Sequence, residues 1–146
     1  MRIVIQRVTS AKVEVEGKIV GSIRKGALVL FGAHKEDIAS QTLWLTQKLV
    51  NLRIFSDAQD KMNLSLLDIQ GEVLIVSQFT LYGDCSEGRR PAFTDAAPPE
   101  MAKSLYEKFI AEVAEQKLKV QTGIFGARMQ VSLTNDGPIT LILDAK

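Results

Sequence analysis

The sequence predicts an α+β fold: a single compact domain with a mixed, mostly antiparallel β-sheet as a barrel-like core and two main helices packed on it. Three observations lead to this prediction. Strand-like segments outnumber helical ones, tight turns join several of them as hairpins, and two segments place apolar residues at helical spacing. The 146 residues, 46% of them hydrophobic, suffice for one domain over residues 1–146 with a sizeable core and are too few for two.

The first third of the chain predicts three strands. Residues 2–16 alternate between apolar and polar, which indicates a long strand with one solvent-facing side, bent near residues 9–10. Gly17 predicts a tight turn into a second strand over residues 19–23, so that the two strands form a hairpin. The continuous apolar run over residues 27–32 is typical of a central strand.

Two segments predict amphipathic helices. Apolar residues over 37–51 share one face, with Asp37 or Ser40 as the cap, and residues 51–55 then form a short strand. The prolines at 98–99 suit the beginning of the second helix. Apolar residues recur in that helix at every fourth position: Met101, Leu105, Phe109 and Val113.

A buried strand that begins at Glu72 is the centre of the predicted site. Its first half is aliphatic and β-branched, and strand character continues as far as Tyr82. Buried polar groups need hydrogen-bond partners, so polar residues at the exit of such a strand indicate a site. The alternative is a core strand whose hydroxyls bond the neighbouring backbone. Four residues are the candidates: Ser77, Gln78, Phe79 and Thr80.

The C-terminal segment predicts further strands, over residues 119–123, 129–133 and 139–143. A turn over residues 135–138 separates the last two. Pro138 is the only proline within strand-like sequence, and such a proline is expected at a strand start, an edge or a turn. Gly137 and Pro138 are therefore a second candidate site element.

Composition and charge exclude several classes of protein. The net charge of +1 is low for a protein that coats nucleic acid, so any nucleic-acid contact is expected to be local. The only cysteine, Cys85, cannot form an intramolecular disulfide, which indicates a reducing compartment. No signal sequence or membrane span is recognisable. We therefore expect a cytoplasmic protein that does not enter membranes.

The usual catalytic motifs are missing. His34 is the only histidine and lies in a charged loop, where we interpret it as a solvated residue. With one histidine and one cysteine, no metal site is expected, and neither a phosphate-binding loop nor a dinucleotide motif occurs, so no cofactor is expected. The Arg89-Arg90 pair is either a solvated patch or a phosphate contact. From the residues alone, the site is a hydrolase-like pocket or a binding pocket at the exit of a central strand.

Two stretches of sequence also carry a family resemblance. Residues 77–83 (SQFTLYG) and 134–140 (TNDGPIT) resemble the two signature motifs of D-aminoacyl-tRNA deacylases. Residues 5–8, 51–55 and 88–91 resemble that family as well, so the likeness runs from the first strand to the last.

The resemblance implies a homodimeric enzyme, with its active site at the subunit interface, that hydrolyses the ester between a D-amino acid and the 3′ end of tRNA. It implies that Gly137 and Pro138, joined by a cis peptide bond, reach into the partner's pocket and exclude an L side chain. Glycine mischarged on tRNA would pass this filter. Arg7 would brace the Gly-Pro pair, and Phe125 and Met129 would hold the terminal adenine.

The resemblance also bears on the chemistry. Thr80 is the side chain usually suspected as the nucleophile in this family, but without a base we interpret it as a positioning group. Backbone N–H groups around Phe79 and Thr80 would stabilise the developing oxyanion instead. Two alternatives stay open. One is a non-catalytic module that binds tRNA or another partner through Arg89 and Arg90. The other is a small-molecule hydrolase with Thr80 or Cys85 as its nucleophile.

Overall fold

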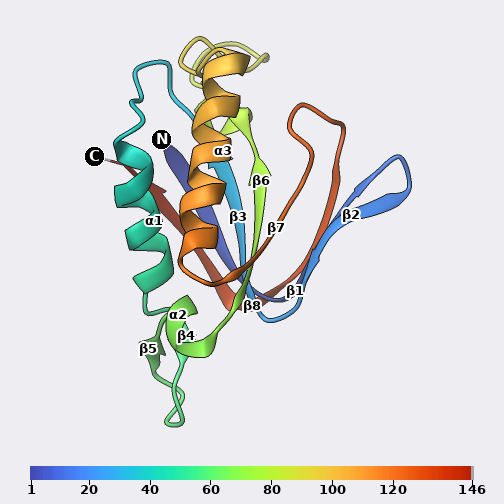
Figure 1. Cartoon of the computed structure of the whole chain (residues 1–146). Coiled ribbons are helices and arrows are strands. Elements are labelled where there is room, and N and C mark those ends of the chain that lie inside the picture. Colours follow the sequence, from blue (N-terminus) through green and yellow to red (C-terminus); the bar gives the residue numbers. More distant parts are fainter. Residues whose placement is uncertain (146) are drawn as a thin grey trace.

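The computed structural model describes residues 1–145 and confirms the predicted fold class: one α+β domain with a mixed, mostly antiparallel sheet (Figure 1). Six strands form the main sheet: β1 (Arg2–Val15), β2 (Lys18–Ile23), β3 (Gly26–Gly32), β6 (Glu72–Ser77), β7 (Lys119–Thr122) and β8 (Gln130–Asp144). The helices are α1 (Gln41–Asn51), the short α2 (Leu66–Ile69), the 3₁₀ turn η1 (Phe79–Tyr82) and α3 (Pro99–Glu115). A two-stranded ribbon contains β4 (Phe55–Ser56) and β5 (Met62–Leu64).

The sheet is organised around β1. The strand order is β2-β1-β3-β6-β7, and β8 pairs with β1 along most of its length. Strand β1 runs antiparallel to β2, β3 and β8, whereas β6 is parallel to both β3 and β7. The parallel pairs bring the carboxyl ends of β3 and β6 to the same edge of the sheet, beside the beginning of α3 (Figure 1).

The sheet curls until its outer strands touch, which gives the barrel-like core. A Cβ atom placed on Gly21 of β2 would lie 2.4 Å from the carbonyl oxygen of Thr122 of β7, so the two backbones are in close contact. Only glycine allows this approach. The apolar cluster that fills the curl is made of Val8, Ala11, Val13, Ile23, Leu28, Leu74 and Val76.

The larger core lies between the sheet and its helices. Leu45 and Leu49 of α1 and Phe109 and Val113 of α3 are all buried, as their helical spacing predicts. They pack on the sheet residues that alternate toward them, including Ile3, Ile5, Val29, Phe31, Val73 and Ile75. Figure 1 shows α1 and α3 side by side on that face of the sheet.

The predicted strand over residues 72–82 was wrong in its second half. Strand β6 ends at Ser77, and residues 79–82 form η1. The partner strand β3 ends at Gly32, so no ladder acceptors continue beyond it. The chain closes local bonds instead, from the N–H of Leu81 to the carbonyl of Gln78 at 3.2 Å and from Gly83 to Thr80 at 2.9 Å.

Three other boundaries differ from the predictions. Helix α1 begins at Gln41, so that Ser40, one of the two predicted caps, occupies the N-cap position, although its side chain makes no capping hydrogen bond. The Asp37 carboxylate instead accepts the N–H of His34 at 2.6 Å and holds the preceding loop. The short strand predicted over 51–55 covers only residues 55–56. The turn predicted over 135–138 does not divide two strands, since β8 continues through it with shifts in its pairing to β1.

Candidate functional site

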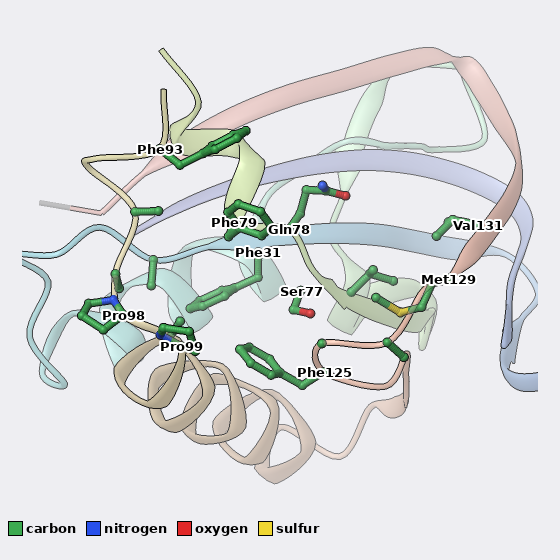
Figure 2. Close-up of a pocket in the computed structure, with 17 residues that line it drawn as sticks. Phe31, Ser77, Gln78, Phe79, Phe93, Pro98, Pro99, Phe125, Met129 and Val131 are labelled. Carbon is green, nitrogen blue, oxygen red and sulfur yellow. The ribbon is translucent and has the colours of Figure 1, made fainter. Parts of the chain in front are cut away.

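A cavity of about 690 Å³ opens at the carboxyl ends of β3 and β6 (Figure 2). The strands contribute residues such as Phe31 and Ser77, and the start of α3 closes one side with Pro98 and Pro99. This volume lies in the range of small-molecule sites. The full lining is Phe31, Ala33, Val76, Ser77, Gln78, Phe79, Phe93, Ala96, Ala97, Pro98, Pro99, Ala102, Phe125, Gly126, Ala127, Met129 and Val131.

Aromatic rings form the wall of the cavity next to α3. The ring of Tyr106 lies 5.9 Å from that of Phe31 and 5.8 Å from that of Phe125, measured between centroids. The Tyr106 hydroxyl donates a hydrogen bond to the carbonyl oxygen of Ile75 at 2.8 Å. Burial raises the pKa of Tyr106 to about 12, so it remains a neutral donor that ties α3 to β6.

The cavity lining contains no ionisable side chain. Its side-chain polar groups are the Ser77 hydroxyl and the Gln78 amide, and the remainder is aliphatic, aromatic or proline. His34 and Cys85 are outside the lining. Such a site can hold an apolar or aromatic group, but its side chains supply no general base.

Two backbone N–H groups at the cavity edge have no acceptor among the described residues. The N–H of Gln78 donates to the carbonyl of Phe31 at 2.7 Å, and the next donor with a partner is that of Leu81. The N–H groups of Phe79 and Thr80 lie between these two donors. They are the first two N–H groups of η1, and the first N–H groups of a helix have no acceptor within it. Both are therefore available to bind an oxygen atom.

The Thr80 side chain is exposed and lies outside the cavity lining. Its hydroxyl oxygen accepts a short hydrogen bond from the Gln78 amide nitrogen. Among the described residues, no histidine or carboxylate bonds to this hydroxyl. This arrangement orients Thr80 and does not activate it as a nucleophile.

Gly137 and Pro138 are exposed, and the peptide bond between them is cis, as the family resemblance predicted. Arg7 holds the residues that precede them. Its side chain, in a residue only 8% exposed, donates to the carbonyl of Asp136 at 3.2 Å and to that of Ile54 at 2.7 Å. It also forms an ion pair of 3.1 Å with the Asp136 carboxylate.

Asn135 holds the same segment from the other side. Its amide nitrogen donates to the carbonyls of Arg7 at 2.8 Å and of Ile139 at 2.9 Å. Gly137 has a φ of +121°, and a Cβ placed on it would lie 2.8 Å from the Arg7 guanidinium. Glycine is therefore required here both by the backbone conformation and by the packing of Arg7.

Within one chain the two candidate elements are far apart. Arg7, beside the Gly-Pro pair, is opposite Ala27 at the start of β3, whereas Ser77 is opposite Phe31 near its end. Ala27 and Phe31 are four residues apart on β3, which corresponds to about 13 Å along the strand. Neither Gly137 nor Pro138 lines the cavity, while Phe125 and Met129 do.

Several lining residues were missed by the sequence predictions, among them Phe31, Phe93, Ala96 and Ala97. Residues 85–97 have the composition of an exposed loop, yet their second half forms a cavity wall. The N–H of Ala97 donates to the carbonyl of Ala33 at 2.9 Å and so fixes that wall to the end of β3. The one feature of the sequence that could have indicated this wall is Phe93, a lone aromatic residue within a polar loop.

Fold and site together define a class: a small α+β protein with an apolar cavity, whose polar groups are backbone amides, one hydroxyl and one carboxamide. Comparison with known proteins then assigns the chain to a family. Residues 4–144 match the family model described as D-Tyr-tRNA(Tyr) deacylase. The chain belongs to the D-aminoacyl-tRNA deacylase family, and the predicted resemblance is confirmed.

Relatives of high identity cover the whole chain. The chain is 62% identical to a D-aminoacyl-tRNA deacylase of Thermosipho africanus (strain TCF52B), over 100% of this chain and 98% of that protein. It is 61% identical to a protein of the same name from Fervidobacterium nodosum (strain ATCC 35602 / DSM 5306 / Rt17-B1), with the same coverage.

Solved structures share the fold. A structure named "c-Myc DNA Unwinding Element Binding Protein" superposes with a TM-score of 0.93 at 39% identity, covering 100% of this chain and 99% of the other. A structure described as a probable eukaryotic D-amino acid tRNA deacylase gives a TM-score of 0.85 at 18% identity, with 97% of each chain covered. In residues 1–145, no helix is both long and apolar enough to span a membrane.

Proposed function

We propose that the chain hydrolyses the ester that joins a D-amino acid to the 3′ end of tRNA, releasing the free D-amino acid and the tRNA. One observation carries the proposal: two free backbone N–H groups, those of Phe79 and Thr80, at the edge of an apolar cavity without an ionisable lining residue. An aminoacyl ester is an activated substrate, so its hydrolysis does not demand a protein base.

The chemistry then divides between substrate and backbone. Water attacks the carbonyl carbon, assisted by the adjacent ribose 2′-hydroxyl, and the bond to the ribose 3′ oxygen breaks as that oxygen takes up a proton. The N–H groups of Phe79 and Thr80 bind the carbonyl oxygen as it becomes negative. One such donor contributes roughly 2.7–4 kcal/mol to the transition state where it has been measured in other enzymes. Ser77 and Gln78 position the ester and the water.

The terminal adenosine occupies the apolar part of the cavity. The Phe125 ring and the Met129 thioether line it, and both suit the flat face of an adenine. In the view of Figure 2, both side chains lie below Gln78 and Phe79. The adenosine is thus held on one side while the ester faces the backbone donors.

Selection of the D form requires a second copy of the chain. Gly137 and Pro138 are exposed, and Arg7 and Asn135 bond to the residues on either side of them, Asp136 and Ile139. The pair lies about 13 Å along β3 from its own chain's Ser77. In a homodimer, the pair from one subunit enters the cavity of the other and faces the substrate Cα. An L side chain clashes with the Gly-Pro carbonyls, whereas a D side chain points away and glycine has nothing to exclude. Glycine mischarged on tRNA is therefore a second substrate.

The outer strand β8 supports such a dimer. Ile142 is 66% exposed and Leu141 is 40% exposed, on the same strand as the Gly-Pro pair. Phe79, at the cavity edge, is 55% exposed. Exposed apolar residues on an edge strand favour association with another subunit.

A non-catalytic nucleic-acid-binding module is the second candidate. It is favoured by the similarity to the solved structure at 39% identity, whose name describes a protein that binds a DNA unwinding element. Such a module needs neither free backbone donors nor the separated Gly-Pro pair. The deacylase proposal uses both, and it places the protein in the cytoplasm with the aminoacyl-tRNA that it edits.

The deciding experiment compares the decay of D-Tyr-tRNA and L-Tyr-tRNA with the purified protein and in buffer alone. The proposal expects rapid loss of the D ester and little change for the L ester. If the D ester decays with the protein at the same rate as in buffer, the deacylase proposal is wrong and the binding module is the function that remains. A small-molecule hydrolase that uses Cys85 would form a covalent acyl-enzyme, whereas the deacylase proposal expects Cys85→Ala to retain full deacylase activity.

A further inference from the structure

The arginines of this chain divide into two groups. Four of the seven bond to acceptors: Arg2 with Asp144, Arg7 with Asp136, Arg24 with Glu72, and Arg53 with Asn63. The other three make neither an ion pair nor a side-chain hydrogen bond with any described residue: Arg89, Arg90 and Arg128. All three are exposed.

These three arginines flank segments that line the cavity. Arg128 lies between Ala127 and Met129, both of which are in the lining. Arg90 is three residues before Phe93, whose ring packs against that of Phe79 at 5.1 Å between centroids. The segments that carry these arginines thus border the same cavity at two places, one at Phe93 and one at Ala127 and Met129.

The loop that carries Arg89 and Arg90 has a fixed base and a solvent-exposed tip. The N–H of Asp84 donates to the carbonyl of Ala92 at 2.8 Å, and the reverse bond measures 2.9 Å. This bridge anchors the loop beside Phe93, at the top of the molecule in Figure 1, near the start of α3. The bridge therefore fixes the base of the loop next to Phe93, while the side chains of Arg89 and Arg90 are exposed at its tip.

Most nearby carboxylates are already engaged. Asp95 pairs with Lys35 at 2.8 Å, and Asp84 accepts the N–H of Ser86 at 2.9 Å. Glu87 is the remaining acid of the loop, and it makes no ion pair with a described residue. The N–H of Ser86 orients the Asp84 carboxylate but does not neutralise it. Three guanidinium groups against the carboxylates of Asp84 and Glu87 still leave an excess of positive charge beside a cavity lined without charge.

We propose that Arg89, Arg90 and Arg128 bind the phosphate groups of the tRNA acceptor strand as it enters the cavity. The inference rests on the proposed function, since it takes the terminal adenosine as the group inside. The phosphates that precede this adenosine must then cross the rim of the cavity. Guanidinium groups bind phosphate through paired N–H donors, and uncommitted ones do so without first breaking an ion pair.

The test is a triple variant, Arg89→Gln with Arg90→Gln and Arg128→Gln. Its control removes the same charge elsewhere, by Lys18→Gln, Lys61→Gln and Lys117→Gln, three exposed lysines that make no ion pair with described residues. The readouts are KM and kcat on D-Tyr-tRNA, hydrolysis of 3′-O-D-tyrosyl-adenosine, and binding of uncharged tRNA as a function of salt.

The proposal expects a distinct pattern. The triple variant raises KM for D-Tyr-tRNA and the Kd for tRNA about 10-fold or more above the control. The slope of log K for tRNA binding against the logarithm of the salt concentration becomes less steep by about 2, because each of three lost phosphate contacts to a single strand contributes about 0.7. The tyrosyl-adenosine, which carries no phosphate, is hydrolysed within two-fold of the wild-type rate.

A tRNA affinity and salt slope equal to those of the lysine control would overturn the proposal. Failure of the proposed function gives a different result, in which the wild-type protein hydrolyses neither ester. In that case the binding of uncharged tRNA still decides the role of the three arginines.

Discussion

The backbone N–H of Gln78 donates to the carbonyl oxygen of Phe31 at 2.7 Å, and this is the bond at which the β3–β6 ladder stops. Beyond it, the chain turns into η1 and leaves the next two N–H groups without an acceptor among the described residues. The end of a parallel ladder thus creates a pair of directed donors at the edge of the cavity. Their position depends on the backbone more than on the side chains of the signature motif.

The first prediction concerns the Phe79 N–H. Phe79→Pro deletes this donor at the first position of a helix, where proline is tolerated, and Phe79→Leu deletes only the ring. We expect kcat for D-Tyr-tRNA to fall roughly 100- to 1000-fold in Phe79→Pro relative to Phe79→Leu, because one oxyanion donor is lost. Circular dichroism and thermal unfolding of both variants serve as the folding check. Equal kcat values in the two variants would exclude the backbone donor.

The second prediction concerns the side chains that were candidates for nucleophile and base. Thr80→Val and His34→Ala are expected to keep kcat within about 10-fold of wild type, a loss smaller than removal of a general base or nucleophile causes. Steady-state kinetics on D-Tyr-tRNA provides the measurement. A loss of about 1000-fold in Thr80→Val, with an acyl-enzyme trapped in the wild type, would identify Thr80 as the nucleophile.

The third prediction concerns Arg7. Arg7→Lys keeps the charge but cannot reach the carbonyls of both Ile54 and Asp136 as the guanidinium does. We expect a loss of about 2 kcal/mol in the free energy of unfolding, and a fall in the ratio of kcat/KM for D-Tyr-tRNA over L-Tyr-tRNA as the Gly-Pro pair loosens. Arg24→Lys, at an exposed ion pair, is the matched control. A ratio unchanged from wild type would show that Arg7 has no part in chiral selection.

The fourth prediction concerns Glu72 and acid stability. A hydrogen bond from the N–H of Arg24, with Lys119 and the Arg24 guanidinium nearby, lowers the pKa of Glu72 below its usual 4.5. The unfolded state then binds the proton more tightly, so this stabilisation is present above pH 4.5 and is lost as pH falls through the folded-state pKa. Glu72→Gln is expected to cost about 1 kcal/mol at about pH 7 and nothing at about pH 2. Urea unfolding at both pH values checks this, with Glu115→Gln as the control. An equal cost at both pH values would assign the effect to packing.

The alternation and periodicity of the sequence were enough to predict the fold class and the main elements, but not the order of the strands. The alternation of residues 2–16 became β1, and the four-residue spacing from Met101 to Val113 became α3. These patterns work because one face of each element is buried. The exit of β6 could not be predicted in the same way, since the end of its strand character is set by Gly32, the last residue of a neighbouring strand.

The site was less accessible to prediction. Residues 77–80 stood out as polar residues after a buried strand, but the contact between Arg7 and Asp136 joins positions 129 residues apart and leaves no local pattern. The wall from Phe93 to Ala97 lacks periodicity, because it is fixed by single backbone bonds such as that from Ala97 to Ala33. The roles proposed for Gly137 and Pro138 came from the family resemblance alone.

In the proposed homodimer, each active site combines Phe79 of one subunit with the Gly-Pro pair of the other. A disulfide test addresses this pairing directly, with Phe79→Cys and Pro138→Cys introduced into one chain in which Cys85 is replaced by Ser. We predict that mild oxidation converts this variant to a covalent dimer on a non-reducing gel, while either single cysteine variant remains monomeric. A double variant that stays monomeric under the same oxidation, although it is folded, would contradict the account.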